Sequence, residues 1–106
     1  MRTGGLRPII VALMLGATAV PAHAATIQIV MENLMISPAA ASAKVGDTVE
    51  WVNKDILAHT ATAGNGDFDV TIPPKQTMTL VLKKPGEVAY YCRFHPNMKA
   101  TLTITP

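Results

Sequence analysis

The segment YCRFHPNM, residues 91–98, sets the plan of this chain, because it joins two predicted strands, residues 87–92 and 100–105, at one end of a β-structure. It contains the only cysteine of the sequence, and Cys92, His95 and Met98 follow one another at intervals of three residues. A thiolate, an imidazole and a thioether are soft or borderline metal ligands. Pro96 favours a sharp turn that aims all three at one point, because its ring fixes φ. Taken singly, the three residues have ordinary alternatives: a buried thiol, a surface imidazole and a core thioether.

The rest of the chain is a series of short apolar stretches separated by turn residues. Apolar and polar alternation or β-branched composition predicts strands at residues 26–31, 48–53, 59–63, 68–72, 77–82, 87–92 and 100–105. Residues 35–38 end an early segment, and the small residues 39–43 fit either a loop or an edge strand. No segment has a helical period. We therefore predict an all-β fold, an antiparallel β-sandwich or barrel of seven or eight strands.

The stretch around the only tryptophan indicates which face of one strand is buried. Val49, Trp51 and Asn53 share a face by the two-residue period of a strand, and we expect Trp51 in the core. Residues 54–58 then form a loop that carries Ile56 and Leu57 shortly before His59. These two large apolar side chains are expected either to be buried or to form a docking surface.

The first 24 residues have the three parts of a signal peptide. Arg2 and Arg7 precede an apolar run at residues 9–15, and the segment ends in an Ala-x-Ala sequence. We expect cleavage after Ala24, which leaves residues 25–106 as one domain in the periplasm. The two arginines are not adjacent, which favours a Sec-type route over a twin-arginine route. The alternative, an uncleaved membrane anchor, is disfavoured because the run is short for a hydrocarbon core of roughly 30 Å.

Charge and cysteine content narrow the classes of function. The chain has nine Lys and Arg against seven Asp and Glu, and loss of Arg2 and Arg7 leaves seven against seven. A nearly neutral domain lacks the basic surface that binds nucleic acid, so we expect no such partner. The charges are uneven, since residues 73–106 carry five positive charges and one negative charge, and an acidic partner surface is one interpretation. A single cysteine cannot form an internal disulfide, and metal ligation would protect it in an oxidising compartment.

A fourth ligand follows by elimination. His23 leaves with the leader, so the mature domain keeps only His59 and His95. By itself, His59 fits an ordinary surface histidine; beside Cys92, His95 and Met98 we predict that it completes a metal site. Two histidines, a cysteine and a weak axial methionine favour copper. Zinc is a poorer match, because structural zinc takes a fourth Cys or His and catalytic zinc keeps an open position for water.

Four motifs of the chain resemble those of the cupredoxins, the type 1 blue-copper proteins: residues 45–53, His59-Thr60, Pro85-Gly86 and residues 90–98. The likeness covers nearly all of residues 26–105. The Cys-x-x-His-x-x-Met spacing is similar to that of the amicyanin branch, whereas plastocyanins and pseudoazurins have a longer interval before the methionine. The resemblance implies a Greek-key antiparallel β-sandwich with copper near one end. The ligands that it implies are His59, Cys92, His95 and Met98.

The resemblance also implies a function, namely electron transfer between transient redox partner proteins, for which a dehydrogenase that oxidises amines and a cytochrome are candidates. We expect a monomer. The outer edge of His95 should reach the surface within an apolar rim, with Arg93 and Lys99 either steering an acidic partner or simply solvated; the candidates for the rim are Ile56, Leu57, Phe94 and Pro96. Two positions depart from the family pattern. Thr60 stands where asparagine follows the first histidine, and Ala100 stands where glycine is frequent.

Two other functions are weighed against the electron carrier. A copper-handling protein, which stores or delivers the ion, could use Met31, Met35 and Met78 as extra ligands, although methionines in strands more often fill the core. An enzyme finds little support, because four protein ligands leave no open position and no histidine remains to act as a general base.

Overall fold

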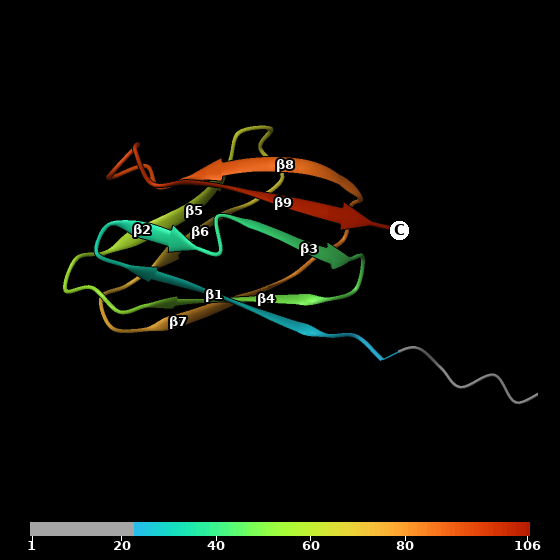
Figure 1. Cartoon of the computed structure of the whole chain (residues 1–106), viewed down its shortest axis with the longest axis horizontal. Helices are drawn as coiled ribbons and strands as arrows, with labels where there is room; N and C mark the ends of the chain where they lie inside the picture. Colours follow the sequence, from blue (N-terminus) through green and yellow to red (C-terminus); the bar gives the residue numbers. More distant parts are fainter. Residues whose placement is uncertain (1–22) are drawn as a thin grey trace, which may run out of the picture.

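The computed structural model describes residues 23–106, so most of the leader expected at residues 1–24 lies outside the described residues. Two β-sheets pack face to face (Figure 1). Their strands are β1 (Thr26–Glu32), β2 (Met35–Ser37), β3 (Ala40–Lys44), β4 (Thr48–Asn53), β5 (His59–Ala63), β6 (Asp69–Ile72), β7 (Thr77–Val81), β8 (Gly86–Tyr91) and β9 (Lys99–Thr105). The predicted all-β sandwich is confirmed. Within residues 23–106, no helix is long and apolar enough to cross a membrane.

The strands number nine in the described residues, more than the seven or eight predicted. The additional strands are short: β2 pairs with β1, and β3 pairs with β9 at the edge of the second sheet. Residues 39–43 therefore contribute to an edge strand rather than a loop. β2 has only three residues and β3 consists mostly of alanine, so neither shows enough apolar alternation to be recognised as a strand from the sequence.

The sheets are mixed, whereas the prediction was antiparallel. One sheet has the order β2-β1-β4-β7 and the other β3-β9-β8-β5-β6. Most neighbours are antiparallel, but β1 runs parallel to β4 and β3 runs parallel to β9. The chain passes from one sheet to the other five times, between β2 and β3, β3 and β4, β4 and β5, β6 and β7, and β7 and β8, so strands that pair are often distant in sequence.

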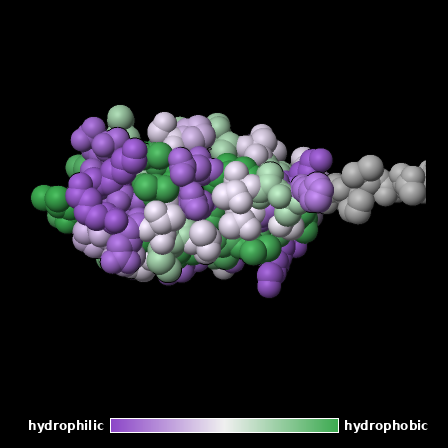
Figure 2. All heavy atoms as spheres, turned by 90° about the horizontal axis from the view of Figure 1, so that it is seen from below, coloured by the Kyte–Doolittle hydropathy of each residue, from purple (hydrophilic) through white to green (hydrophobic). Residues whose placement is uncertain are grey.

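The loops that matter for function meet at one end of the sandwich, the left end in Figure 1. There β4 is connected to β5 by residues 54–58, and β8 is connected to β9 by residues 92–98. Hydrophobic atoms are exposed at the same end (Figure 2). The turn at residues 45–47, between β3 and β4, lies at the other end.

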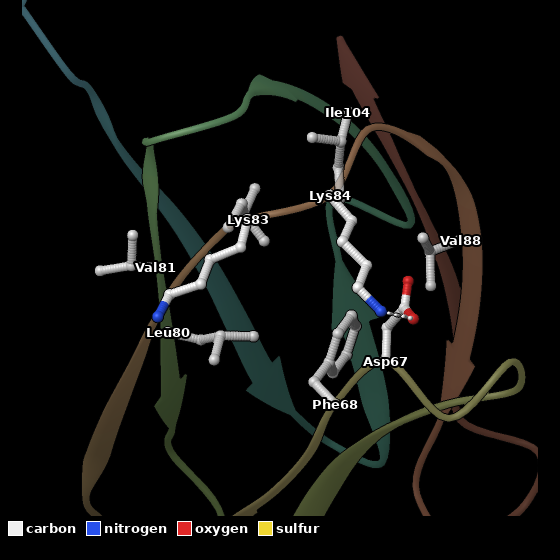
Figure 3. Close-up of a pocket in the computed structure, with 9 residues that line it drawn as sticks. Asp67, Phe68, Leu80, Val81, Lys83, Lys84, Val88 and Ile104 are labelled. Carbon is white, nitrogen blue, oxygen red and sulfur yellow. Dashed lines mark ion pairs between the residues drawn. The ribbon is translucent and has the colours of Figure 1, made fainter. Parts of the chain in front are cut away.

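A small pocket of about 100 Å³ opens at the other end (Figure 3). Phe68, Val88 and Ile104 contribute to its apolar wall. Beside them, Lys84 Nζ lies 3.5 Å from Asp67 Oδ1 in an exposed ion pair. Ion pairs of this kind contribute about 0–1 kcal/mol, and no histidine or cysteine lines this pocket.

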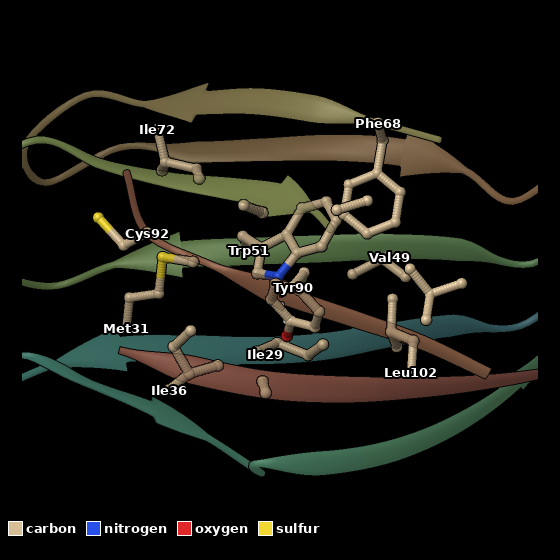
Figure 4. Packing of buried hydrophobic residues seen from close by; sticks show 14 of the residues in the cluster. Ile29, Met31, Ile36, Val49, Trp51, Phe68, Ile72, Tyr90, Cys92 and Leu102 are labelled. Carbon is tan, nitrogen blue, oxygen red and sulfur yellow. Dashed lines mark hydrogen bonds between the residues drawn. The ribbon is translucent and has the colours of Figure 1, made fainter. Parts of the chain in front are cut away.

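The core lies between the inner faces of the sheets (Figure 4). In β4, Trp51 is fully buried and Asn53 is 1% exposed, so both lie on the inner face, as the alternation predicted. Trp51 packs against Phe68 and Tyr90, with ring centroids 5.7 and 5.8 Å away. Burial of each large apolar side chain contributes about 1.5–3 kcal/mol. Cys92 lies at the opposite end of this cluster from Phe68, so the core fixes the strand end that carries the thiol.

Candidate metal centre

Three of the four predicted ligands converge at the left end of the sandwich. His59 is the first residue of β5, Cys92 directly follows β8, and His95 lies in the loop before β9. Cys92 Sγ is 3.7 Å from Nδ1 of His59 and 3.7 Å from Nδ1 of His95. The ligand atoms of the three residues all lie within 4.8 Å of one another. Cys92 and His59 are fully buried, and His95 is half-buried.

Met98 closes the loop that carries the other two ligands. Its side chain is only 2% exposed. The Cys92 N–H donates to the Met98 carbonyl at 3.0 Å, and the Met98 N–H donates to the His95 carbonyl at 2.8 Å. The His95 N–H donates in turn to the Cys92 carbonyl at 3.3 Å. These bonds turn the chain back on itself within seven residues, as the three-residue spacing predicted.

The donor set fits a soft or borderline cation. His59 Nε2 lies 2.8 Å from Asp55 Oδ2, so the ring hydrogen sits on Nε2 and the lone pair sits on Nδ1. That lone pair faces the sulfur of Cys92. The single hydrogen of a thiol can bridge the sulfur to only one of the two imidazole nitrogens, whereas a cation between them can be bound by both nitrogens and the sulfur. Two imidazole nitrogens and a thiolate suit copper, and a thioether, the side-chain donor of Met98, suits Cu(I) in particular.

Asp55 is a site residue that the sequence reasoning missed. Besides holding His59, its carboxylate accepts N–H bonds from Asn33 at 2.8 Å and Leu34 at 3.2 Å in the turn between β1 and β2. Partial burial acts to raise the pKa of Asp55, but the hydrogen bonds from His59 and from the two backbone N–H groups outweigh it and lower that pKa below its usual range. The only sequence signal was its position in the loop before His59.

Comparison with known proteins identifies the family. The model of the cupredoxin-like domain matches residues 5–104, which is nearly the whole chain. The chain belongs to the cupredoxin-like family. The match begins inside the expected leader, and cleavage after Ala24 stays a prediction.

Individual cupredoxin relatives agree with this assignment. The methylamine utilization protein MauL of Methylorubrum extorquens is 32% identical over 97 residues, which cover 86% of this chain and 85% of that protein. The amicyanin structure from Paracoccus versutus has a TM-score of 0.64 at 25% identity and covers 80% of this chain and 84% of its own. A copper-containing nitrite reductase from Thermus scotoductus has a TM-score of 0.69 at 24% identity, but only 25% of its chain is covered, so it shares the fold alone.

Thr60 braces the ligand loop of this cupredoxin in two ways. Its backbone N–H donates to Cys92 Sγ at 3.4 Å, and its hydroxyl accepts the N–H of Arg93 at 2.8 Å. Thr60 is fully buried although its side chain lies on the outer face of β5, because the ligand loop covers it. The departure from asparagine at this position therefore leaves a side-chain link between β5 and the residue after the cysteine.

The residues of the predicted apolar rim are exposed, and Figure 2 shows hydrophobic atoms at the surface of this end. Ile56 is 79% exposed, Phe94 51% and Leu57 47%, and Pro96 is also exposed. Two residues that the sequence did not place in the rim, Leu34 and Met35, are also exposed in and beside the turn that Asp55 holds. Arg93 is partly engaged within the protein, because its Nε lies 3.2 Å from Asp69 Oδ1 and its guanidinium lies 5.4 Å from the ring centroid of Phe94.

Proposed function

We propose that this cupredoxin binds one copper ion through His59, Cys92, His95 and Met98 and carries single electrons between redox proteins. The observation that carries the proposal is the convergence of two imidazole nitrogens on a buried sulfur, each at 3.7 Å. Copper bound by these residues would supply the one-electron chemistry by alternating between Cu(II) and Cu(I). The protein is therefore an electron carrier rather than an enzyme.

The protein supplies a fixed and dry set of ligands. His59 is held from outside by Asp55, and the sulfur of Cys92 is held by the Thr60 N–H. Both ligands have no exposed surface, so water does not compete with them. Hydrogen bonds behind the ligands orient them and tune the bound metal. A donor set that moves little between the two oxidation states favours fast electron transfer.

Electrons would enter and leave through the half-buried His95. The apolar rim of Ile56, Leu57, Phe94 and Pro96 gives a partner close approach to this ring without a large contact area, which suits a short-lived complex. The name of the relative MauL connects that protein with methylamine utilisation. We therefore propose a dehydrogenase that oxidises amines as the electron donor and a cytochrome as the acceptor, both in the periplasm.

A copper titration tests this function against copper storage or delivery. Cu(II) is added to the purified protein, the visible spectrum is recorded, and the reduced protein is then challenged with a Cu(I) chelator. The carrier predicts an intense blue band from the thiolate, reversible one-electron cycling and retention of copper. A colourless complex, or rapid loss of copper to the chelator, would refute the carrier in favour of copper handling.

Two variants and a control check the assignment of the ligands. Cys92→Ser should abolish the blue band, because the hydroxyl oxygen of serine cannot replace the soft thiolate. Met35→Leu is the matched control for Met98→Leu, since Met35 is exposed at the same end of the sandwich while Met98 is buried in the ligand loop. Only Met98→Leu should change the position of the blue band and the reduction potential.

A further inference from the structure

A closed ring of hydrogen bonds joins the ligand loop to the outer face of β5 and β6. The Arg93 N–H donates to Thr60 Oγ1 at 2.8 Å, and Thr60 Oγ1 lies 2.9 Å from Thr62 Oγ1. The Thr62 hydroxyl donates to Asp69 Oδ1 at 2.8 Å, and Arg93 Nε donates to the same oxygen at 3.2 Å. Arg93 therefore takes part in the ring twice, once through its backbone N–H and once through its side chain.

Strand register places the members of the ring side by side. Thr62 and Asp69 are directly opposite each other in the antiparallel pair of β5 and β6. Thr60 and Thr62 are two residues apart and so project from the same face of β5. Arg93 follows Cys92 just beyond the end of β8, which pairs with the other side of β5. Three separate segments thus meet above Thr60.

The direction of every bond in the ring is determined. Ionised Asp69 only accepts hydrogen bonds, and the single hydroxyl hydrogen of Thr62 is given to it. The hydroxyl hydrogen of Thr60 must therefore be the one that lies between the two threonines. Thr60 Oγ1 is then left with its lone pairs directed at the Arg93 N–H. Asp69 thus sets the orientation of the Thr60 hydroxyl through Thr62.

The same threonine touches the candidate metal ligand. The Thr60 backbone N–H is the donor to Cys92 Sγ, and the Thr60 hydroxyl holds the residue that follows Cys92. We propose that Thr62 and Asp69 are positioning residues of the copper site, which act through Thr60 to hold the cysteine sulfur against its N–H donor. This inference rests on the proposed function, because it assigns a role in tuning the same site.

The expected effect has a definite sign. An N–H bond to the sulfur withdraws electron density from the thiolate and so favours Cu(I) over Cu(II). Thr62→Val removes the acceptor that fixes the Thr60 hydroxyl, which loosens the link to Arg93 and the N–H bond to sulfur. We expect the ratio of Cu(II) to Cu(I) affinity to rise by up to about tenfold, which is a fall of about 59 mV in reduction potential for one electron.

Conservative variants separate positioning from general stability. Thr62→Ser keeps the hydroxyl and should restore the potential of the wild type. Thr103→Val is the matched control, because Thr103 is an exposed threonine on β9 of the same sheet. It should leave the potential and the blue band unchanged.

Asp69 provides an independent test of the same idea. Asp69→Ala and Asp69→Asn lose the same charge, but the amide oxygen of asparagine can still accept from Thr62 and Arg93. Loss of the negative charge alone should raise the reduction potential equally in the two variants. Loss of the acceptor should lower it only in Asp69→Ala, so this variant should have the lower potential of the two.

A measurement on the copper-free protein keeps the inference testable if a loaded variant is unstable. The Arg93 amide hydrogen is the one bonded to Thr60, so its exchange with solvent, followed by NMR, should accelerate about tenfold in Thr62→Val and Asp69→Ala. It should stay slow in Thr62→Ser and Thr103→Val. Exchange and potential in Thr62→Val that match those of Thr103→Val would overturn the inference. If instead the wild type formed no blue, redox-active copper complex, the proposed function itself would fail, whereas the exchange result would still report whether the ring holds Arg93.

Discussion

Asn53 is the buried polar residue on which the loop before His59 depends. Its side-chain amide donates to three backbone carbonyls: Leu57 at 2.8 Å, Ile72 at 3.1 Å and Pro73 at 3.2 Å. Its side-chain oxygen accepts the Asp55 N–H at 2.9 Å. One residue therefore ties both ends of the 54–58 loop to the connection after β6. We expect Asn53→Ala to destabilise the fold and to disorder this loop.

The size of the effect follows from the bonds that are lost. The amide has two hydrogens, so the three short contacts represent about two donated bonds, and the oxygen accepts one more. At about 1 kcal/mol net for each bond, Asn53→Ala should lower the free energy of unfolding by about 3 kcal/mol, and by more where a buried carbonyl finds no water. This is a large part of the roughly 5–15 kcal/mol that stabilises a small domain.

Denaturant unfolding of the metal-free protein measures the loss directly. Thiol reductant keeps Cys92 free, and an unchanged denaturant slope would show that the unfolded state is comparable. Asn65→Ala is the matched control, because Asn65 accepts the N–H of Asp67 at 2.9 Å in the same two-residue pattern but is exposed. Asn65→Ala should lower the free energy of unfolding by less than about 1 kcal/mol. Equal losses for the two variants would refute the view that the buried amide organises the loop.

Three further predictions concern stability and docking. Backbone N–H groups at positions 25 and 44 donate to the Asp47 carboxylate and lower its pKa in the folded protein. The ionised carboxylate therefore stabilises the fold above the pKa of the unfolded state, and this stabilisation is lost as pH falls through the pKa of the folded state. Asp47→Asn should make the thermal midpoint depend less on pH between about pH 5 and pH 2, and a dependence as steep as that of the wild type would contradict this. Burial raises the pKa of Tyr90 to about 12, although the hydrogen bond from Trp51 acts to lower it. The stability of the fold should therefore fall as pH rises from 10.0 towards that value. Tyr90→Phe should remove this loss of stability at alkaline pH, as measured by thermal unfolding followed by circular dichroism. Ile56→Lys should change stability by less than about 0.5 kcal/mol but slow electron transfer to a partner in stopped-flow measurements, whereas Val45→Lys, at the other end of the molecule, should leave the rate unchanged.

The sequence was sufficient for features that depend on local patterns. Alternation placed Trp51 and Asn53 on the buried face of one strand, because the two-residue period of a strand is independent of its neighbours. The loop from Cys92 to Met98 was predictable for a similar reason, since its ligands are close in sequence and the turn that brings them together is short. Elimination was enough to select His59 as the candidate partner of this loop, because His95 is the one other histidine outside the leader, and the structure brings the two close together.

Features that depend on strand pairing were not predictable. The parallel pairs of β1 with β4 and of β3 with β9 are set by the order in which the sheets assemble, which no local pattern contains. The residues that support the candidate ligands were missed for the same reason. Asp69 meets Arg93 across 24 positions, and Asp55 meets the turn at Asn33 across 22. From the sequence, a carboxylate that supports a ligand cannot be distinguished from a solvated surface carboxylate, because its partners depend on which strands pair.

The hydrogen bonds that hold the candidate ligands help to distinguish between the two proposed functions, electron transfer and copper handling. Two of the four candidate ligands are held by bonds from other segments, His59 by Asp55 and Cys92 by Thr60, and Met98 is bonded to the backbone of Cys92 within the ligand loop. These partners are anchored in strands or in turns tied to strands, so the arrangement of the ligands is a property of the folded chain and does not depend on the metal. A protein that delivers copper needs ligands that yield to an acceptor, and a protein that transfers electrons needs ligands that stay in place. We therefore infer that the number and origin of these supports favour the electron carrier over copper handling, since release of the ion would require the sheet ends themselves to move.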